Sequence, residues 1–371
     1  MKHGLGTLKL TEEDVQSAVE VIDSNWLSPG PRVKEFERAF SGLHNQKHGV
    51  MVNSGTDALR IVLAALKEKY RWNDGDVVLV PSVTFVATVN VVLQLNLKPM
   101  LVDVGMYDFN LNPDNLDRRL STMPGHSNVK AVMPVHLGGR PCDMARIMDI
   151  AKKYDLKVLE DSCETMGVGG ICRGDVTAFS FYVAHLLTTG VGGMATTNDP
   201  DLARLMWSYA NHGRKEPGKF EFERIGYSCR PTEFEAAIGL NQLPKLHDIV
   251  EKRRKNAFYL YKHLQAFSDL CVSYFPDSAC MFFPVVLKQT SDVKKQDLMD
   301  HLANHGIESR DLMPLTNQPC YKGLWGPEPY SVAHWVNEKG FYIGCHQDMT
   351  RSDLDDVVEA FRAFNLTKES I

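Results

Sequence analysis

The chain has 371 residues, of which 23% are charged, and its formal net charge at pH 7 is −5. This length predicts a large core, and the mildly acidic balance without runs of like charge argues against nucleic acid as a partner. The N-terminal MKHGLGTLKLTEED lacks the apolar core of a signal peptide, and the most apolar region, residues 77–95, is interrupted by Pro81 and polar residues. We therefore expect no membrane partner and no transmembrane segment.

The eight cysteines include no CxxC or CxC pair. This pattern predicts neither a zinc site nor a disulfide framework, and we expect no bound metal. Free thiols in a reducing cytoplasm are the simplest interpretation.

The first two-thirds of the chain alternates apolar runs with amphipathic segments. Helices are expected at residues 56–70 and 144–154, and short strands at 77–82, 99–104, 129–136, 156–162 and 178–184. Strands that are apolar throughout and separated by helices favour a mostly parallel sheet covered on both faces. Polar residues follow three of these strands, namely His136, Asp161 and Ser180. Ligands bind at the carboxyl ends of strands in such sheets, so these residues are candidates for a site.

The pattern changes near residue 240. Residues 241–267 are expected to form one long helix, followed by a strand at 280–287 and helices at 294–304 and 352–364. We therefore predict an α/β protein with a large domain at 1–245 and a smaller C-terminal α/β domain at 246–371.

Three short segments carry possible chemistry, and each also has a purely structural explanation. Ser54, Gly55 and Thr56 precede a helix directly, which suits an anion site but also an ordinary helix cap. Asp161 could pair with a protonated pyridine nitrogen or simply cap a helix or form a salt bridge. Ser180 lies five residues before His185, and its hydroxyl could hold a phosphate.

The order and spacing of these segments carry more information than each does alone. The blocks SGTDAL, PSVTFVATVNVV, PVHLGGRPCDM, LEDSCETMG, FSFYVAH, RIGYSCRPTEFEAAIGLNQL and FYIGCHQDMT resemble those of the DegT/StrS-like sugar-nucleotide aminotransferases. The likeness runs from residue 27 to about residue 350. It implies pyridoxal 5'-phosphate (PLP) or its aminated form, pyridoxamine 5'-phosphate (PMP), as cofactor. It also implies the type I PLP-dependent transferase fold of aspartate aminotransferase, and a homodimer in which each subunit completes its neighbour's active site.

The resemblance assigns roles to residues by position. Ser54, Gly55, Thr56 and Ser180 are implied to hold the cofactor phosphate, Phe85 to stack on its ring, and Asp161 to contact the pyridine nitrogen. Glu164 is implied near the ring hydroxyl, where the family usually has Gln. Ser228 stands where the family usually has an Asn that reaches the partner's cofactor. Arg230 and His346 are implied on the substrate side. A carboxylate at position 164 would repel the ring oxygen unless one of the two groups is protonated.

Position 185 departs from the transaminating members, which have a lysine there. An imidazole cannot form the stable Schiff base that a lysine amine forms, but it can move a proton near neutral pH. With a histidine at this position, the sequence resembles the sugar 3-dehydratase branch of the family, which includes GDP-4-keto-6-deoxymannose 3-dehydratase. That branch implies removal of the carbon-3 hydroxyl from a nucleotide-linked 4-keto-6-deoxy sugar, with His185 as base and L-glutamate restoring PMP.

A related CDP-sugar enzyme uses an iron–sulfur cluster with a Cys-x-Cys pair. This chain lacks such a pair, which favours the cluster-free version. Two other hypotheses stay open: an aminotransferase whose lysine was mutated, and a non-catalytic homologue that binds cofactor or sugar.

Overall fold

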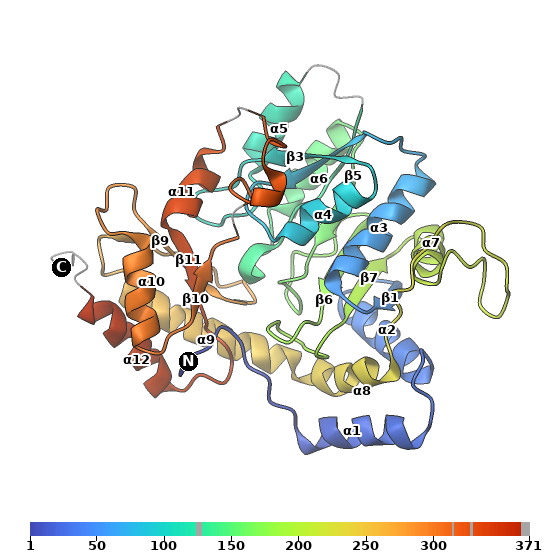
Figure 1. Cartoon of the computed structure of the whole chain (residues 1–371), viewed down its shortest axis with the longest axis horizontal. Helices are drawn as coiled ribbons and strands as arrows, with labels where there is room; N and C mark the ends of the chain where they lie inside the picture. The colour runs from blue at the N-terminus through green and yellow to red at the C-terminus, as the bar shows by residue number, and fades with distance from the viewer. Residues whose placement is uncertain (124–127, 314, 327–328, 365–371) are drawn as a thin grey trace.

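The computed structural model describes the chain except residues 124–127, 314, 327–328 and 365–371. A seven-stranded sheet forms its centre, in the order β1-β7-β6-β5-β4-β2-β3 (Figure 1). Its strands are β1 (His48–Val52), β2 (Val77–Pro81), β3 (Lys98–Val102), β4 (Val129–Val132), β5 (Lys157–Asp161), β6 (Val176–Ser180) and β7 (Gly193–Thr197). Strands β2 to β6 run parallel to one another, and β7 is antiparallel to both β1 and β6.

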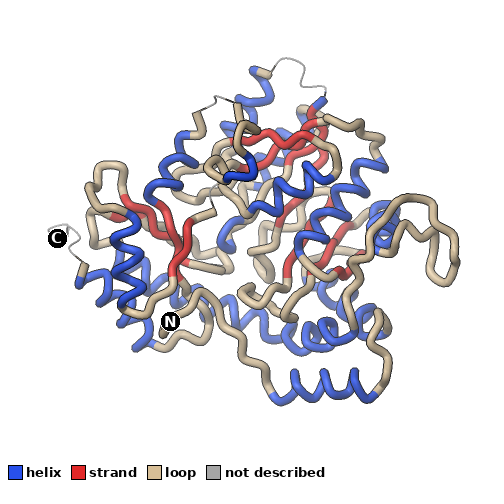
Figure 2. The backbone as a smooth tube through the Cα atoms, viewed as in Figure 1, coloured by secondary structure: helices blue, strands red, loops and turns tan. Residues whose placement is uncertain are grey.

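Alternation along β2 explains why this sheet is covered on both sides. Val78 and Val80 face one hydrophobic cluster, and Val77 and Leu79 face another. Successive side chains of a strand point to opposite faces, so a strand with no polar residue needs packing partners on both. Figure 2 shows helices on both sides of the strands.

The helices of this part of the chain pack against one another in three sets. Helix α3 packs against α4 and α7, and α5 packs against α6, while α2 contacts β1 and α8. Their bounds are α1 (Glu12–Asp23), α2 (Pro31–Leu43), α3 (Gly55–Lys69), α4 (Val86–Gln94), α5 (Pro113–Thr122), α6 (Met144–Lys153), α7 (Pro200–Ala210) and α8 (Glu233–Gln242).

A second, four-stranded sheet has the order β10-β11-β9-β8 and is antiparallel throughout. Its core is a separate hydrophobic cluster that includes residues of α9, α10 and α12. The elements are α9 (Leu246–Leu264), β8 (Leu270–Cys271), β9 (Phe283–Leu287), α10 (Lys295–Asn304), β10 (Ser309–Asp311), α11 (Ser331–Lys339), β11 (Gly340–Ile343) and α12 (Arg351–Ala363).

This architecture confirms the predicted fold class, a large mostly parallel sheet with a smaller α/β unit. The single helix expected at 241–267 is wrong in one respect. The structure has a short 3-10 turn at Leu243–Lys245 between α8 and α9. Pro244 lacks a backbone N–H and interrupts the helical ladder there. In the described part of the chain, no helix has the length and apolar character needed to cross a membrane.

Candidate active site

The start of α3 and the end of β6 meet at the carboxyl edge of the large sheet. A Cβ built on Gly55 would lie 2.6 Å from Ser180 Cβ and 2.9 Å from Cys163 Sγ. Ser54 is the N-cap of α3, and its hydroxyl accepts a hydrogen bond from Asp57 N at 3.1 Å. The structure therefore brings Ser54, Gly55 and Ser180 into one small volume.

This volume has the chemistry of an anion site. The first-turn N–H groups of α3 have no partner within the helix, and the positive end of the helix dipole lies with them. The glycine turn after His185 packs against the start of α3. A Cβ on Gly193 would lie 2.3 Å from Ser54 O, and the φ of Gly192 is 144°, so both positions favour glycine. Thr56 is half-buried beside Gly55.

Asp161 is buried at the end of β5 and is held by two hydrogen bonds. Its Oδ2 accepts from Thr88 Oγ1 at 2.8 Å, and its Oδ1 accepts from Cys163 N at 3.2 Å. Thr88 also contacts the Thr84 hydroxyl at 2.9 Å. Burial raises the pKa of the Asp161 carboxyl. A cationic N–H group placed against it would be strongly favoured, because a buried carboxylate needs a partner.

Phe85 lies beside this group and is exposed. It is the N-cap of α4, makes no side-chain cap bond, and is 60% exposed although its neighbours Thr84 and Ala87 are buried. An aromatic face open to solvent at the edge of a buried polar site suits stacking on a planar ring.

Glu164 accepts a hydrogen bond from Gly138 N at 2.7 Å and is buried. Burial is the main cause that raises its pKa to about 8, and the neighbouring Asp161 raises the pKa further. The carboxyl is therefore protonated at neutral pH and can donate a hydrogen bond to an anionic oxygen. This state removes the like-charge conflict that a carboxylate at position 164 would create.

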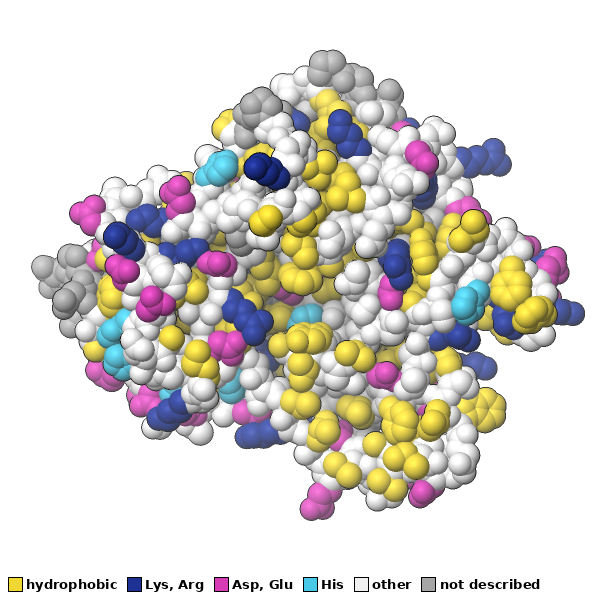
Figure 3. All heavy atoms as spheres, viewed as in Figure 1, with side chains coloured by type: hydrophobic (Ala, Val, Ile, Leu, Met, Phe, Trp, Pro, Cys, Tyr) yellow, Lys and Arg dark blue, Asp and Glu magenta, His cyan; other side chains and the backbone are white. Residues whose placement is uncertain are grey.

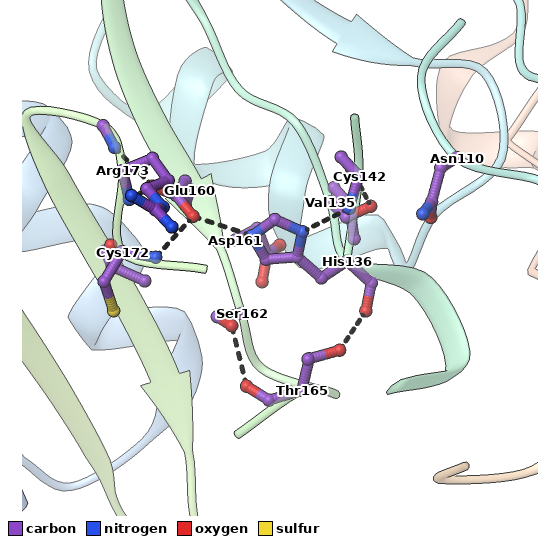
Figure 4. Close-up of polar contacts among 12 residues, drawn as sticks. Asn110, Val135, His136, Cys142, Glu160, Asp161, Ser162, Thr165, Cys172 and Arg173 are labelled. Atoms are coloured by element: carbon purple, nitrogen blue, oxygen red, sulfur yellow. Dashed lines mark hydrogen bonds and ion pairs between the residues drawn. The ribbon is translucent and has the colours of Figure 1, made fainter. Parts of the chain in front are cut away.

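His136, which also follows a strand, has a structural role instead (Figure 4). Its Nε2 lies 2.8 Å from Glu160 Oε2, and its Nδ1 accepts from Cys142 N at 3.0 Å. Nε2 therefore carries the hydrogen and donates it to Glu160. Glu160 also accepts from the backbone of residues 172–174. This buried pair fixes the loops around β5, while the hydrogen bonds of Asp161 go to Thr88 and Cys163 instead.

His185 lies within the loop between β6 and β7, five residues after Ser180. Its Nδ1 is 3.3 Å from Ser180 O, and its ring meets the Tyr182 ring edge-on at 5.7 Å between centroids. His185 is half-buried. The atoms packed around its imidazole lower its pKa to about 4 by desolvation, and the nearby cation of Arg253 also lowers it. Because a carbonyl oxygen can only accept, Nδ1 carries the hydrogen, and Nε2 keeps its lone pair.

The other three predicted site residues lie outside this group. Ser228 and Arg230 are exposed, and Arg230 Nη2 donates to Ser228 Oγ at 3.2 Å. Cys229 between them accepts from Asn53 N at 2.9 Å, so this segment lies beside the start of α3. His346 follows β11 in the smaller unit, and its backbone oxygen accepts from Asn256.

Sequence reasoning missed two contributors, Thr88 and the backbone N–H of Gly138. Thr88 lies 73 residues from Asp161, and no local sequence pattern predicts the hydrogen bond between the two side chains. Gly138 has φ 63° in a short 3-10 turn, and the glycine pair at 138–139 was a signal for an unusual backbone there.

The comparisons with known proteins give the family of the chain. Residues 8–362 match the DegT/DnrJ/EryC1/StrS aminotransferase family. The chain belongs to this family. The GDP-perosamine synthase of Caulobacter vibrioides is 31% identical over 355 residues, 92% of each chain. The GDP-4-keto-6-deoxy-D-mannose 3-dehydratase of Yersinia pseudotuberculosis is 29% identical over 392 residues, 96% of each chain.

The solved structures give the same fold. A crystal structure of GDP-4-keto-6-deoxymannose-3-dehydratase with a trapped PLP-glutamate geminal diamine matches with a TM-score of 0.89 and 27% identity, covering 96% of this chain and 99% of that chain. PLP, with its aminated form PMP, is the cofactor of this family. The residues present fit it: an anion cradle at Gly55 and Ser180, an exposed aromatic face at Phe85, and a buried carboxyl at Asp161.

Proposed function

We propose that this protein is a PMP-dependent 3-dehydratase of a nucleotide-linked 4-keto-6-deoxy sugar. The observation that carries the proposal is a histidine, His185, in the loop between β6 and β7, where a transaminating member has its lysine. The likeness to a 3-dehydratase over almost the whole of both chains supports it. The likeness to GDP-perosamine synthases supports nucleotide-sugar chemistry more broadly.

His185 would act as the base. Its hydrogen bond to Ser180 O fixes the ring and leaves the Nε2 lone pair to take a proton. The lowered pKa keeps the imidazole neutral through the physiological range, so the base is ready without prior deprotonation. Without a lysine amine at this position, the cofactor would be held by noncovalent contacts alone.

The remaining residues would bind and orient. The start of α3 and Ser180 would hold the phosphate, Phe85 would cover the ring, and Asp161 would keep the ring nitrogen protonated. Protonated Glu164 would donate to the ring hydroxyl oxygen. When bound, PMP supplies the amine that joins the sugar ketone and the electron sink that lets the carbon-3 hydroxyl leave. Arg230 and His346 are proposed substrate-side residues.

The stoichiometry of this reaction separates it from transamination. Removing the hydroxyl reduces the sugar by two electrons, which L-glutamate supplies as it becomes 2-oxoglutarate. The transferred nitrogen then leaves as ammonia. A transaminase instead keeps that nitrogen on the sugar and releases no ammonia.

We also propose a homodimer with shared active sites. Helix α1 and the turn after it expose a set of large apolar side chains, Val15, Val19, Ile22, Trp26 and Leu27. The loop between α7 and α8 exposes Phe220, Phe222 and Ile225, which is 95% exposed. Figure 3 shows both groups as yellow areas on one face. Exposed large apolar side chains that gather in this way mark protein–protein contacts, and the second group lies in the segment just before Ser228.

The test combines a spectrum with a product balance. We expect purified protein loaded with PLP to shift from the aldehyde to the pyridoxamine absorption band when L-glutamate is added. Borohydride treatment followed by denaturation should leave no cofactor on the chain. With GDP- and CDP-4-keto-6-deoxy sugars, one ammonia and one 2-oxoglutarate should form for each 3-deoxy-4-keto sugar, measured by NMR and enzymatic assay.

Two variants sharpen the result. His185→Asn should still bind PLP but lose dehydration, because the base is gone. His185→Lys should become covalently trapped by borohydride and should favour the amino sugar. An amino sugar as the parent's product would overturn the dehydratase proposal in favour of an aminotransferase. Protein that binds no PLP, or binds it without responding to glutamate, would favour the non-catalytic homologue.

A further inference from the structure

A histidine and two aspartates from opposite ends of the chain meet on the smaller unit. His3 Nδ1 lies 3.6 Å from Asp353 Oδ1, and His3 Nε2 lies 3.3 Å from Asp356 Oδ2. One ligand atom from each of the three residues can be chosen so that all lie within 4.8 Å of one another. Figure 1 places the N-terminus beside α12, the helix that carries both aspartates. Aspartates three residues apart lie on the same side of a helix.

The His3 ring is buried although it lies three residues from the chain start. Its residue exposure is only 4%, and Nε2 makes no hydrogen bond. The nearest carboxylate oxygen to Nε2 is Asp356 Oδ2, at 3.3 Å. A buried, unpartnered imidazole nitrogen is costly. The two ring nitrogens face different carboxylates, Nε2 that of Asp356 and Nδ1 that of Asp353.

Both aspartate side chains accept hydrogen bonds from neighbouring groups. Asp353 Oδ2 accepts hydrogen bonds from Thr350 N and Thr350 Oγ1, both at 2.7 Å, and Asp356 Oδ2 accepts one from Lys2 Nζ. Thr350 engages only Oδ2 of Asp353. Oδ1 of Asp353 therefore stays directed toward His3.

We propose that His3, Asp353 and Asp356 form a divalent-cation site, with Zn²⁺ as the best-fitting ion. One imidazole nitrogen and two carboxylate oxygens are a mixed donor set that Zn²⁺ accepts, and a fourth position would be filled by water. Ca²⁺ and Mg²⁺ prefer more oxygen ligands than these three residues offer. Within the described residues, no other group of three His, Cys, Asp or Glu side chains has this spacing.

Lys2 is the competitor of the cation. Its Nζ lies 2.5 Å from Asp356 Oδ2; the Lys2 side chain is largely exposed and that of Asp356 is partly exposed. Binding of Zn²⁺ would displace the ammonium from this oxygen. A variant without the ammonium should therefore bind Zn²⁺ more tightly, which is the opposite of what removal of a ligand does.

The site would act by fixing the N-terminal segment, residues 2–8. Lys2 N and His3 N donate to Gly306 O, and Glu308 N donates to His3 O. Further along, a Cβ on Gly6 would lie 3.1 Å from Ala184 Cα, next to His185. A cation on His3 would thus stiffen a segment that packs against the loop carrying the proposed base. The ligand assignment itself does not depend on the proposed activity.

The test uses untagged, PLP-loaded protein freed of metal with EDTA and titrated with Zn²⁺ by calorimetry. We expect one saturable site per chain and a raised Tm in the parent. His3→Gln and Asp356→Asn should each weaken Zn²⁺ binding by about tenfold or more, since even indirect partners of metal sites are worth that much. Lys2→Met should strengthen it. His305→Gln, which changes an exposed histidine outside the cluster, is the matched control and should bind like the parent.

Three results would overturn the proposal. The first is the absence of saturable Zn²⁺ binding in the parent. The second is equal affinity in His3→Gln, Asp356→Asn and the parent. The third is weaker binding by Lys2→Met. Asp356→Asn guards against misfolding of the His3 variant, because Asp356 is a partly exposed side chain whose replacement leaves the core intact.

Discussion

Gly55, the first residue of α3, lies directly against Ser180, the last residue of β6. The backbone of Gly55 is helical, so its lack of a side chain is a matter of space and not of unusual dihedral angles. A Cβ there would be forced to within 2.6 Å of Ser180 Cβ, well inside van der Waals contact. The proposed phosphate site exists only because position 55 has no side chain.

Gly55→Ala should therefore weaken PLP binding by about tenfold or more and lower the free energy of unfolding by about 1–3 kcal/mol, the usual range for overpacking. Fluorescence titration with PLP and urea unfolding of the cofactor-free protein measure the two effects. Gly42→Ala in α2 is the matched control, because a Cβ there has nothing within 4 Å. That variant should be as stable as the parent or slightly more so. Parent-like PLP affinity in Gly55→Ala would exclude the start of α3 as the phosphate site.

The fold was predictable where the sequence is strongly patterned. The run at 77–82 is apolar on both faces and forms β2 as expected, because only a covered strand tolerates such a sequence. Strand β7 is not predicted from the sequence, because Gly193 and the threonines after Met194 break the apolar run. It is held in place by β1 and β6 on either side, which no local pattern reports.

The site divides in the same way. Gly55, Asp161 and Ser180 were chosen from their blocks, and the structure brings them to one edge of the sheet. The protonation state of Glu164 was not predictable, because it follows from burial and from the Gly138 N–H, which are properties of the fold. The His3 cluster joins the two ends of the chain, so spacing along the sequence carries no trace of it.

Replacing Phe85 separates binding from stability. Phe85→Ala should leave the free energy of unfolding within about 0.5 kcal/mol of the parent, because the ring is 60% exposed and makes no cap bond. It should weaken PLP binding by about tenfold, the effect of losing one aromatic contact worth about 1 kcal/mol plus buried area. Tyr107→Ala removes an equally exposed aromatic ring, 61% exposed, and serves as control. Equal PLP affinity in both variants would argue against stacking on Phe85.

Glu164 makes the stability of the cofactor-free protein depend on pH. Its pKa in the folded state is about 8, against an ordinary value of 4.5. Below pH 4.5 the carboxyl is protonated in both states and costs nothing. As pH rises from 4.5 to 8, the folded protein must keep a proton that the unfolded chain releases, so stability is lost over this window.

Glu164→Gln removes this cost while keeping an acceptor for Gly138 N. The variant should be more stable than the parent by on the order of 1–3 kcal/mol at pH 7, with the difference shrinking toward pH 4.5. Urea unfolding at pH 5, 6 and 7 measures the trend. Glu338→Gln, at an exposed position in α11, should show no such trend. A gain for Glu164→Gln that is the same at every pH would contradict a raised pKa in the folded state.

The pH profile of dehydration reports on His185. Because burial lowers its pKa to about 4, the neutral, basic form predominates at every pH well above 4. The kcat/KM for the nucleotide sugar should therefore stay level between about pH 5 and 7, where a histidine with an ordinary pKa near 6.5 would lose most of its basic form. Nucleoside diphosphate sugars have no secondary phosphate ionisation in this range, so ionisation of the substrate does not change kcat/KM there. The His185→Asn variant gives the kcat/KM that remains at each pH without the proposed base. A steep fall of kcat/KM below pH 6.5 in the parent would mean that His185 titrates normally and is not desolvated in the working enzyme.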